Sequence, residues 1–191
     1  WSGRTSPRMN ITSWLSLVFF LSGVSALIYQ VVWQRLLTLY YGVGAVSIVL
    51  IVSIYMAGLG LGSLLGGFLA ERIKNKIRVY FFIEFLIGCF GLLSISFLRF
   101  WGQKTAGGDY WLSAVYMSVF LMFPTVLMGI TLPLLTKIFN SFVRNFFDTV
   151  SFMYIINTLG AAAGALVSSY LLISFFGLDR AVYSAAGINF L

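Results

Sequence analysis

Long apolar runs separated by short polar segments dominate the chain. Five of them are about 20 residues or longer, enough to cross the roughly 30 Å hydrocarbon core of a bilayer as an α-helix. They occupy residues 11–33, 45–69, 79–98, 111–135 and 151–176. The pattern predicts an all-α fold, a polytopic bundle with five complete transmembrane helices.

A sixth apolar run begins at residue 181 and extends to residue 191. A helix of that length reaches about half-way across the hydrocarbon core, at 1.5 Å per residue. A half-helix would leave its last carbonyl groups without partners inside the membrane. We therefore expect a truncated sixth span, with a half-helix as the alternative, in a single helical domain over residues 1–191.

Composition excludes a water-soluble domain. Only 9% of the 191 residues are charged and 60% are hydrophobic, whereas soluble domains have about 25% charged residues. The chain has no His and a single Cys, Cys89, so we expect no cofactor, no metal site and no His-based acid–base chemistry. The net charge of +7 comes from residues between the apolar runs. This distribution favours membrane-edge charges over nucleic-acid binding.

Lys and Arg are distributed unequally between the two sides of the predicted bundle. One side has eight: Arg4, Arg8, Arg72, Lys74, Lys76, Arg78, Lys137 and Arg144. The other has four: Arg35, Arg99, Lys104 and Arg180. Basic residues prefer the cytoplasmic side, so we expect an integral protein of the cell (inner) membrane with a cytoplasmic N-terminus.

The densest charged cluster lies between the second and third runs. It has the sequence ERIKNKIR and contains Glu71, Arg72, Lys74, Lys76 and Arg78. The simpler interpretation is a basic belt at anionic lipid headgroups. The alternative is a loop that takes part in gating.

Glycine recurs at four-residue steps in the second and fifth runs. Gly58, Gly62 and Gly66 lie in the second, and Gly160 and Gly164 in the fifth. This spacing clears one face of a helix so that another backbone can approach. The same feature in the middle member of each set of three helices indicates a three-plus-three inverted repeat, with halves at about 11–100 and 110–191. The alternative is the general abundance of glycine in membrane helices.

Polar residues within the apolar runs are the candidate ligand or partner sites. Gln30, Gln34 and Thr38 continue a stripe of small residues that starts at Ser22, and Arg35 lies beside it. Such a stripe should face the bundle interior or a wet cavity, although interhelical hydrogen bonding explains it equally well.

Two further candidates lie in the third and fifth runs. Glu84 either lines a pathway or, as we favour, is stabilised by the helix dipole and reaches back to the basic belt. Asn157 shares a face with Gly164, and we expect its amide to find a partner across a helix interface.

Five blocks follow one another along the chain and touch every complete predicted span. They read SGVSALIYQVVWQRLL (22–37), YMAGLGLGSLLGGFLAERI (55–73), IEFLIG (83–88), PTVLMGITLPLL (124–135) and YIINTLGAAAGAL (154–166). In this order they resemble the membrane region of fused spermidine-synthase-like (polyamine aminopropyltransferase-like) integral membrane proteins. That membrane region itself resembles half of a major facilitator transporter.

The resemblance implies a partner and a set of positions. In such proteins the membrane region is joined to a soluble Rossmann-type domain. The segment GFLAERIKNKIR (67–78) resembles the facilitator cytoplasmic loop, with Glu71 where Asp is usual. Gln30, Arg35, Glu84 and Asn157 belong to the recurrent blocks.

We therefore predict a non-enzymatic membrane module that acts as an anchor or as a platform for a ligand or partner. The chain has no alternation of strands and helices and no acidic cluster for a polyamine, so aminopropyl transfer is not expected from it. One alternative is a transporter-like half that moves an amine or another small solute. Another is an accessory subunit of a larger membrane complex. The expected partners are the bilayer and either a Rossmann-type domain or other membrane subunits.

Overall fold

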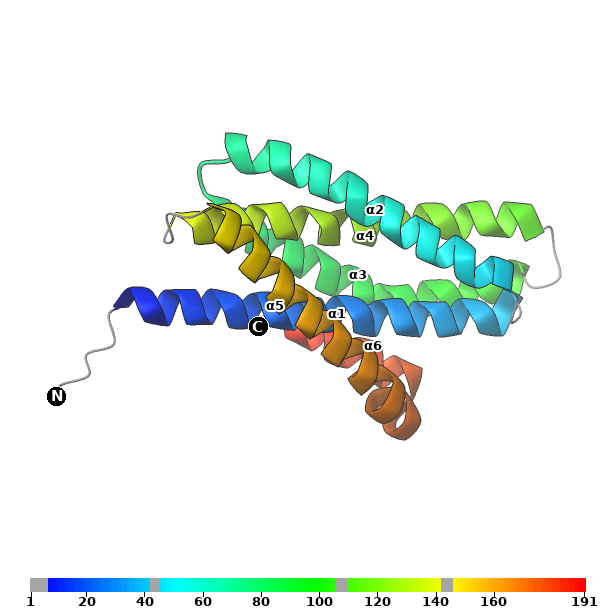
Figure 1. Ribbon diagram of the computed structural model, residues 1–191. Helices are drawn as coiled ribbons and strands as arrows, with labels where there is room; N and C mark the ends of the chain where they lie inside the picture. Colours follow the sequence, from blue (N-terminus) through cyan, green and yellow to red (C-terminus); the bar gives the residue numbers. More distant parts are fainter. Residues whose placement is uncertain (1–6, 42–44, 106–109, 142–145) are drawn as a thin grey trace.

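The computed structural model describes residues 7–41, 45–105, 110–141 and 146–191. Within these ranges the chain forms six α-helices and one π-helical segment (Figure 1). The elements are α1 (Pro7–Tyr41), α2 (Ala45–Arg72), α3 (Lys76–Thr105), α4 (Tyr110–Asn140), α5 (Phe146–Val167), η1 (Ser168–Phe176) and α6 (Gly177–Asn189). The described part of the chain contains no strand, and the predicted all-α class is confirmed.

Five helical ranges are long and apolar enough to cross a membrane. They are Thr12–Leu39, Ile51–Arg72, Lys76–Lys104, Val115–Asn140 and Asp148–Asn189, the last of which includes α5, η1 and α6. The helices extend beyond most of the predicted apolar runs, because polar residues at a membrane edge continue a helix as readily as apolar ones. Of the basic residues used for orientation, Arg4 and Arg144 lie outside the described residues.

The last helix begins earlier than the sequence pattern predicts. The structure starts α6 at Gly177 rather than at residue 181. Gly177 has φ of +81°, a conformation that is costly for residues with a Cβ atom, and it separates η1 from α6. After this bend α6 lies beside α1 and α3 (Figure 1). With 13 residues, α6 is too short to span the membrane alone, and a truncated sixth span stays a prediction.

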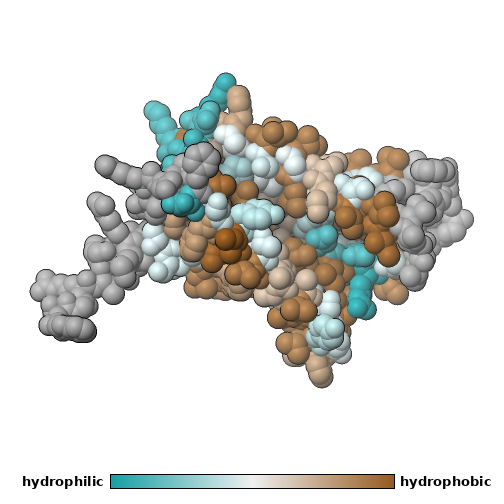
Figure 2. Space-filling view, viewed as in Figure 1, coloured by the Kyte–Doolittle hydropathy of each residue, from teal (hydrophilic) through white to brown (hydrophobic). Residues whose placement is uncertain are grey.

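The outer surface is as apolar as the composition indicates. Hydrophobic residues cover much of the visible face (Figure 2). Large side chains such as Leu64, Leu93 and Val119 are about 70% exposed. Trp33, Tyr29 and the other fully buried side chains lie between the helices. Apolar residues on both the inside and the outside of a bundle are typical of a protein surrounded by lipid.

Helices α2 and α4 approach each other backbone to backbone. A Cβ atom on Gly62 would lie 2.8 Å from the Gly129 Cα, and one on Gly66 would lie 2.8 Å from the Ile130 Cα. A Cβ atom on Gly58 would overlap the side chain of Thr125. Any larger residue at these positions requires the two helices to move apart.

Helices α1 and α5 cross in the same way. A Cβ atom on Gly164 would lie 2.9 Å from the Val24 Cα, and one on Gly160 would overlap the backbone of Phe20. On the α1 side, Gly23 provides the matching space. The α1–α5 and α2–α4 contacts are the two most extensive between helices.

Three contacts correspond between the two crossings. The contact of Gly62 with Val126 corresponds to the contact of Gly160 with Phe20. The contact of Gly66 with Ile130 likewise corresponds to that of Gly164 with Val24. On the facing helices, the contact of Gly129 with Leu59 corresponds to that of Gly23 with Asn157. One constant shift in residue number relates the α2 positions to the α5 positions, and a second constant shift relates the α1 positions to the α4 positions. One further pair of contacts follows the same scheme, since α4 packs on α3 as α1 packs on α6.

Candidate functional site

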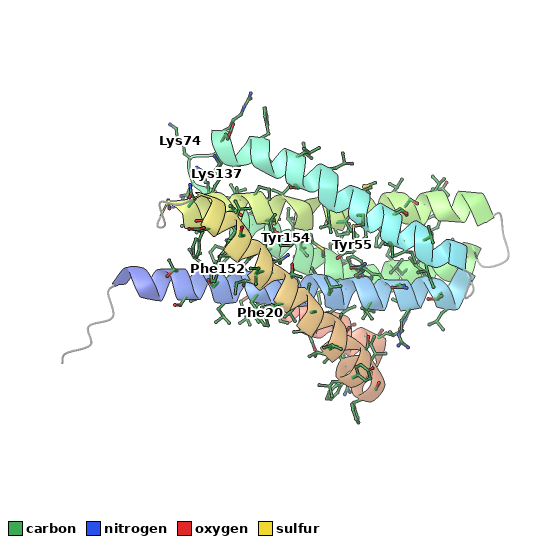
Figure 3. All side chains as sticks on the ribbon, viewed as in Figure 1. Phe20, Tyr55, Lys74, Lys137, Phe152 and Tyr154 are labelled. Atoms are coloured by element: carbon green, nitrogen blue, oxygen red, sulfur yellow. The ribbon has the colours of Figure 1, made fainter. Side chains whose placement is uncertain are left out.

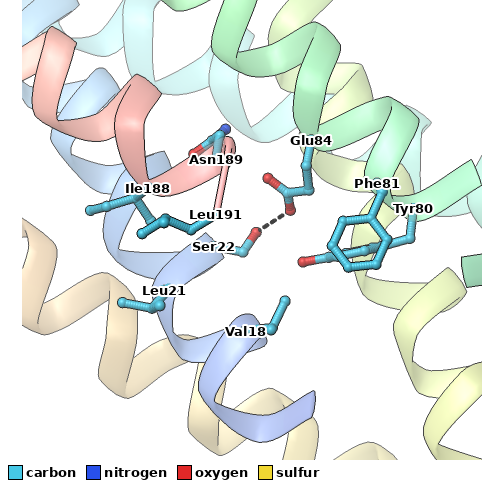
Figure 4. Close-up of a pocket in the computed structure, with 9 residues that line it drawn as sticks. All are labelled: Val18, Leu21, Ser22, Tyr80, Phe81, Glu84, Ile188, Asn189 and Leu191. Carbon is cyan, nitrogen blue, oxygen red and sulfur yellow. Dashed lines mark hydrogen bonds between the residues drawn. The ribbon is translucent and has the colours of Figure 1, made fainter. Parts of the chain in front are cut away.

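A small cavity lies between α1, α3 and the end of α6, and four polar side chains reach it. These are Ser22, Tyr80, Glu84 and Asn189 (Figure 4). The cavity volume is about 30 Å³, enough for a water molecule or a polar group of similar size. Apolar side chains of all three helices form the rest of the wall. They are Val18, Leu21, Phe81, Ile188 and Leu191.

The carboxylate of Glu84 is held against α1. The Ser22 hydroxyl donates a 2.7 Å hydrogen bond to Glu84 Oε1, and Glu84 is only 5% exposed. It lies about 12 Å along α3 from Lys76, at 1.5 Å per residue, and therefore inside the apolar part of the helix. A carboxylate at that depth must be protonated or paired with a cation. None of the nine residues that line the cavity is Lys or Arg.

This geometry differs from the interpretation we favoured for Glu84. Its carboxylate turns across the bundle toward Ser22 instead of back to the basic belt. Lys76, at the start of α3, donates through Nζ to the Ile73 carbonyl at 3.1 Å. The helix dipole acts only over the first turn, and Glu84 lies beyond it.

Two further polar groups face Glu84. Tyr80 lies one helical turn earlier on α3, is 2% exposed, and directs its hydroxyl toward the Ser22–Glu84 pair (Figure 4). Asn189, in the last turn of α6, is 8% exposed. Among the residues that the structure describes, neither its Nδ2 nor its Oδ1 has a hydrogen-bond partner. A buried polar atom without a partner costs about 1–3 kcal/mol, so this amide is a group that a ligand or water would satisfy.

The polar stripe of α1 lies elsewhere. Gln30, Gln34 and Thr38 are half-buried, and Thr38 donates to the Gln34 carbonyl within the helix. Arg35 is exposed. None of these four lines the cavity that contains Glu84. Of the stripe, the structure brings only its first member, Ser22, to Glu84.

Asn157 lies at the α1–α5 crossing. Its backbone oxygen and Oδ1 lie 2.5 and 2.9 Å from where a Cβ atom on Gly23 would be. The residue is half-buried and does not line the Glu84 cavity. Its position indicates helix packing.

The charged loop connects α2 to α3 at one end of the bundle, where an ion pair also links it to α4. Glu71 forms an ion pair with Lys137 of α4 at 3.8 Å, and Figure 3 shows Lys74 and Lys137 at the same end. Arg72 lies over the Phe68 ring, 4.0 Å from its centroid. Asn75 Oδ1 accepts a hydrogen bond from the Arg78 amide, which caps the start of α3. Lys74 and Arg78 are exposed.

Sequence reasoning identified Glu84 but missed Tyr80 and Asn189. Tyr80 had a local signal, since residues four apart on a helix share a face. Asn189 had none, because only the turn at Gly177 brings α6 to α3. In the described part of the chain, no group of three His, Cys, Asp or Glu residues is placed to hold a metal ion.

Comparison with known proteins gives one relative of named function. The chain is 28% identical over 197 residues to a polyamine aminopropyltransferase of Corynebacterium efficiens. The match covers all of this chain but 36% of the relative, so the chain spans about a third of the length of the protein it resembles. No family model and no solved structure matches the chain. A relationship to spermidine-synthase-like proteins is plausible on this similarity.

Proposed function

We propose that this chain is the membrane-embedded helical module of a polyamine aminopropyltransferase-type protein, and that it has no transferase activity of its own. The observation that carries the proposal is the unequal coverage of the match. All of this chain, with its five membrane-length helices, aligns to about a third of the relative. The remaining two thirds of such a protein provide room for a soluble catalytic domain of the Rossmann type.

In this proposal the module anchors the catalytic part at the cytoplasmic face. The exposed cationic side chains of Lys74 and Arg78 and the Glu71–Lys137 pair lie at one end of the bundle, and basic residues favour the cytoplasmic side. The partner would meet the module at that end. An accessory subunit in a larger membrane complex would use the same surface.

The proposed bundle is built as a three-plus-three inverted repeat, as in half of a facilitator-type transporter. Support comes from the matched crossings, in which α2 packs on α4 as α5 packs on α1 through corresponding glycines. The constant shifts in residue number between the two crossings are what a duplicated three-helix unit would produce. The role of Gly58, Gly62, Gly66, Gly160 and Gly164 in this proposal is close helix packing.

Co-purification tests the module role. The chain is tagged at its chromosomal locus, extracted from native membranes with mild detergent, and assayed for aminopropyl transfer. The same chain expressed in a host that lacks the gene is the control for activity of the chain itself, and an unrelated tagged membrane protein is the control for carry-over. We expect activity only in the native preparation. Activity of the chain alone, or none in the native preparation, would contradict the proposal.

Transport of a small cationic solute is the second candidate function. The favouring observation is the buried carboxylate of Glu84 in a cavity between helices, together with the paired crossings. Proteoliposomes containing the purified chain would take up an amine, and Glu84→Gln would abolish the uptake. Asp179→Asn, which changes a solvent-accessible carboxylate outside the charged loop, would leave uptake unchanged. No flux for any amine tested would exclude this function.

A further inference from the structure

The Glu84 cavity combines a buried carboxylate with polar atoms that have no hydrogen-bond partner among the described residues. Ser22 already donates to one Glu84 oxygen, which leaves Glu84 Oε2 as an acceptor. The Asn189 amide is buried, and neither its Oδ1 nor its Nδ2 has a partner among the described residues. The Tyr80 oxygen faces the same space (Figure 4) and accepts a hydrogen bond whichever way its proton points. Three oxygen atoms that can accept a hydrogen bond therefore surround a space of about 30 Å³. The donors beside them, the Tyr80 hydroxyl and Asn189 Nδ2, are neutral and leave the charge of the Glu84 carboxylate unbalanced.

We propose that this cavity binds the terminal ammonium group of a primary amine, with Glu84, Asn189 and Tyr80 each accepting one of its three N–H donors. An –NH₃⁺ group has three donors and no acceptor, and it is similar in size to the water molecule for which the cavity has room. Its positive charge balances the Glu84 carboxylate, which has no Lys or Arg among its cavity neighbours.

The apolar wall favours an alkyl amine over a metal ion. Val18, Leu21 and Ile188 offer methyl groups to the carbon chain that follows the ammonium group. The Phe81 ring also lines the cavity, and an aromatic ring attracts a cation. A hard metal cation prefers six or more oxygen ligands. The described cavity has four polar side chains, and one of them, Ser22, already donates a hydrogen bond to Glu84.

This inference does not depend on the proposed module role or on transport. The cavity would bind the amine at equilibrium in a chain that carries nothing across the membrane and has no catalytic partner. The test is a measurement of amine binding to the purified chain. Its outcome is therefore independent of the co-purification experiment and of the uptake experiment.

The experiment measures binding of n-butylamine to the full chain in detergent micelles, by saturation-transfer NMR. Butyltrimethylammonium has the same charge and carbon chain but no N–H donor. We expect n-butylamine to bind at least ten times more tightly than butyltrimethylammonium. Replacing choline chloride in the buffer with sodium chloride at the same ionic strength is expected to leave the affinity for n-butylamine unchanged.

Variants assign the binding to the cavity. Glu84→Gln removes the charge and keeps the shape, and it should weaken n-butylamine binding at least tenfold. Tyr80→Phe and Asn189→Leu should each weaken it several-fold. Asp179→Asn is the matched control, because this carboxylate is solvent-accessible and lies ten residues before Asn189 on α6, and it should have no effect on binding. Circular dichroism and the size-exclusion profile establish that each variant is folded.

Four results would overturn the proposal. They are equal affinity for the two amines, unchanged affinity in Glu84→Gln, displacement of the amine by sodium alone, and no binding at all. The last would indicate a protonated Glu84 beside a water molecule. If Glu84→Gln does not fold, the comparison of the two amines on the unmodified chain and the Tyr80→Phe variant still decide the question.

Discussion

The indole nitrogen of Trp33 donates a 2.9 Å hydrogen bond to Ser94 Oγ, which joins α1 to α3 in the centre of the bundle. Both residues are almost completely buried. The Ser94 hydroxyl in turn donates a 2.6 Å hydrogen bond to the Gly91 carbonyl oxygen. Buried Trp N–H groups nearly always have such a partner, and here it fixes the relative position of the two helices that hold Ser22 and Glu84.

Replacing Ser94 with Ala should destabilise the bundle through this bond. The Trp33 donor would remain buried without an acceptor, and we expect the free energy of unfolding to fall by about 1–3 kcal/mol. Unfolding in detergent, followed by Trp fluorescence, measures the change. Ser184→Ala is the control, because Ser184 is exposed and donates to the carbonyl of Arg180 in its own helix. Equal effects of the two substitutions would contradict the role of the bond.

The α2–α4 crossing predicts a contrast between neighbouring glycines. Gly62→Val would push a side chain into the α4 backbone, whereas Gly60 has open space around its Cβ position. Overpacking of this kind costs about 1–3 kcal/mol or more. We expect a lower melting temperature and a broader size-exclusion peak for Gly62→Val, and little change for Gly60→Val. Similar behaviour of the two variants would exclude the close crossing.

Because the two crossings match, equivalent Gly→Val substitutions in them should lower the stability of the chain by similar amounts. Gly160 lies on Phe20 as Gly62 lies on Val126, so Gly160→Val should destabilise the chain by an amount within about 1 kcal/mol of that for Gly62→Val. Thermal unfolding in the same detergent measures both. Ala162→Val changes an exposed position of α5 and provides the control there. A large loss at one crossing and none at the other would contradict the repeat.

The expected orientation predicts which side of the membrane each loop faces. In a Cys89→Ser background, which removes the one native thiol, Lys74→Cys should react with a membrane-impermeant maleimide only after the cells are opened. Lys104→Cys, at the other end of α3, should react in intact cells. Labelling of the two positions from the same side would rule out the single crossing of α3, and the reverse pattern would place the N-terminus outside.

The ion pair between Arg99 and Asp179 should contribute weakly. The two side chains lie 2.6 Å apart and are 48% and 38% exposed, and pairs that contact solvent are worth about 0–1 kcal/mol. Asp179→Asn should therefore lower stability by no more than that at low ionic strength. The difference from the unmodified chain should disappear in about 1 M salt, where the Debye length is about 3 Å. A loss that persists at high salt would instead indicate a packing role for Asp179.

The sequence by itself determined the class of the fold and the helical ranges. Whether a run of residues can cross a hydrocarbon layer depends on its own length and polarity, and these are local properties. The spacing of Gly62, Gly66, Gly160 and Gly164 is also local, and it indicated which helix faces would allow a close approach. The start of α6 at Gly177 was misjudged, because the bend there depends on a backbone conformation that hydropathy does not record.

Only the tertiary structure decided which residues meet. Ser22 and Glu84 are 62 positions apart, and the partner of a buried carboxylate depends on how α1 and α3 pack. Asn189 reaches the same cavity because α6 turns back beside α1 and α3. In lipid, apolar side chains are favourable on every face of a helix, so hydropathy leaves open which face turns inward. Close backbone packing and the need to satisfy polar groups within the bundle make that choice.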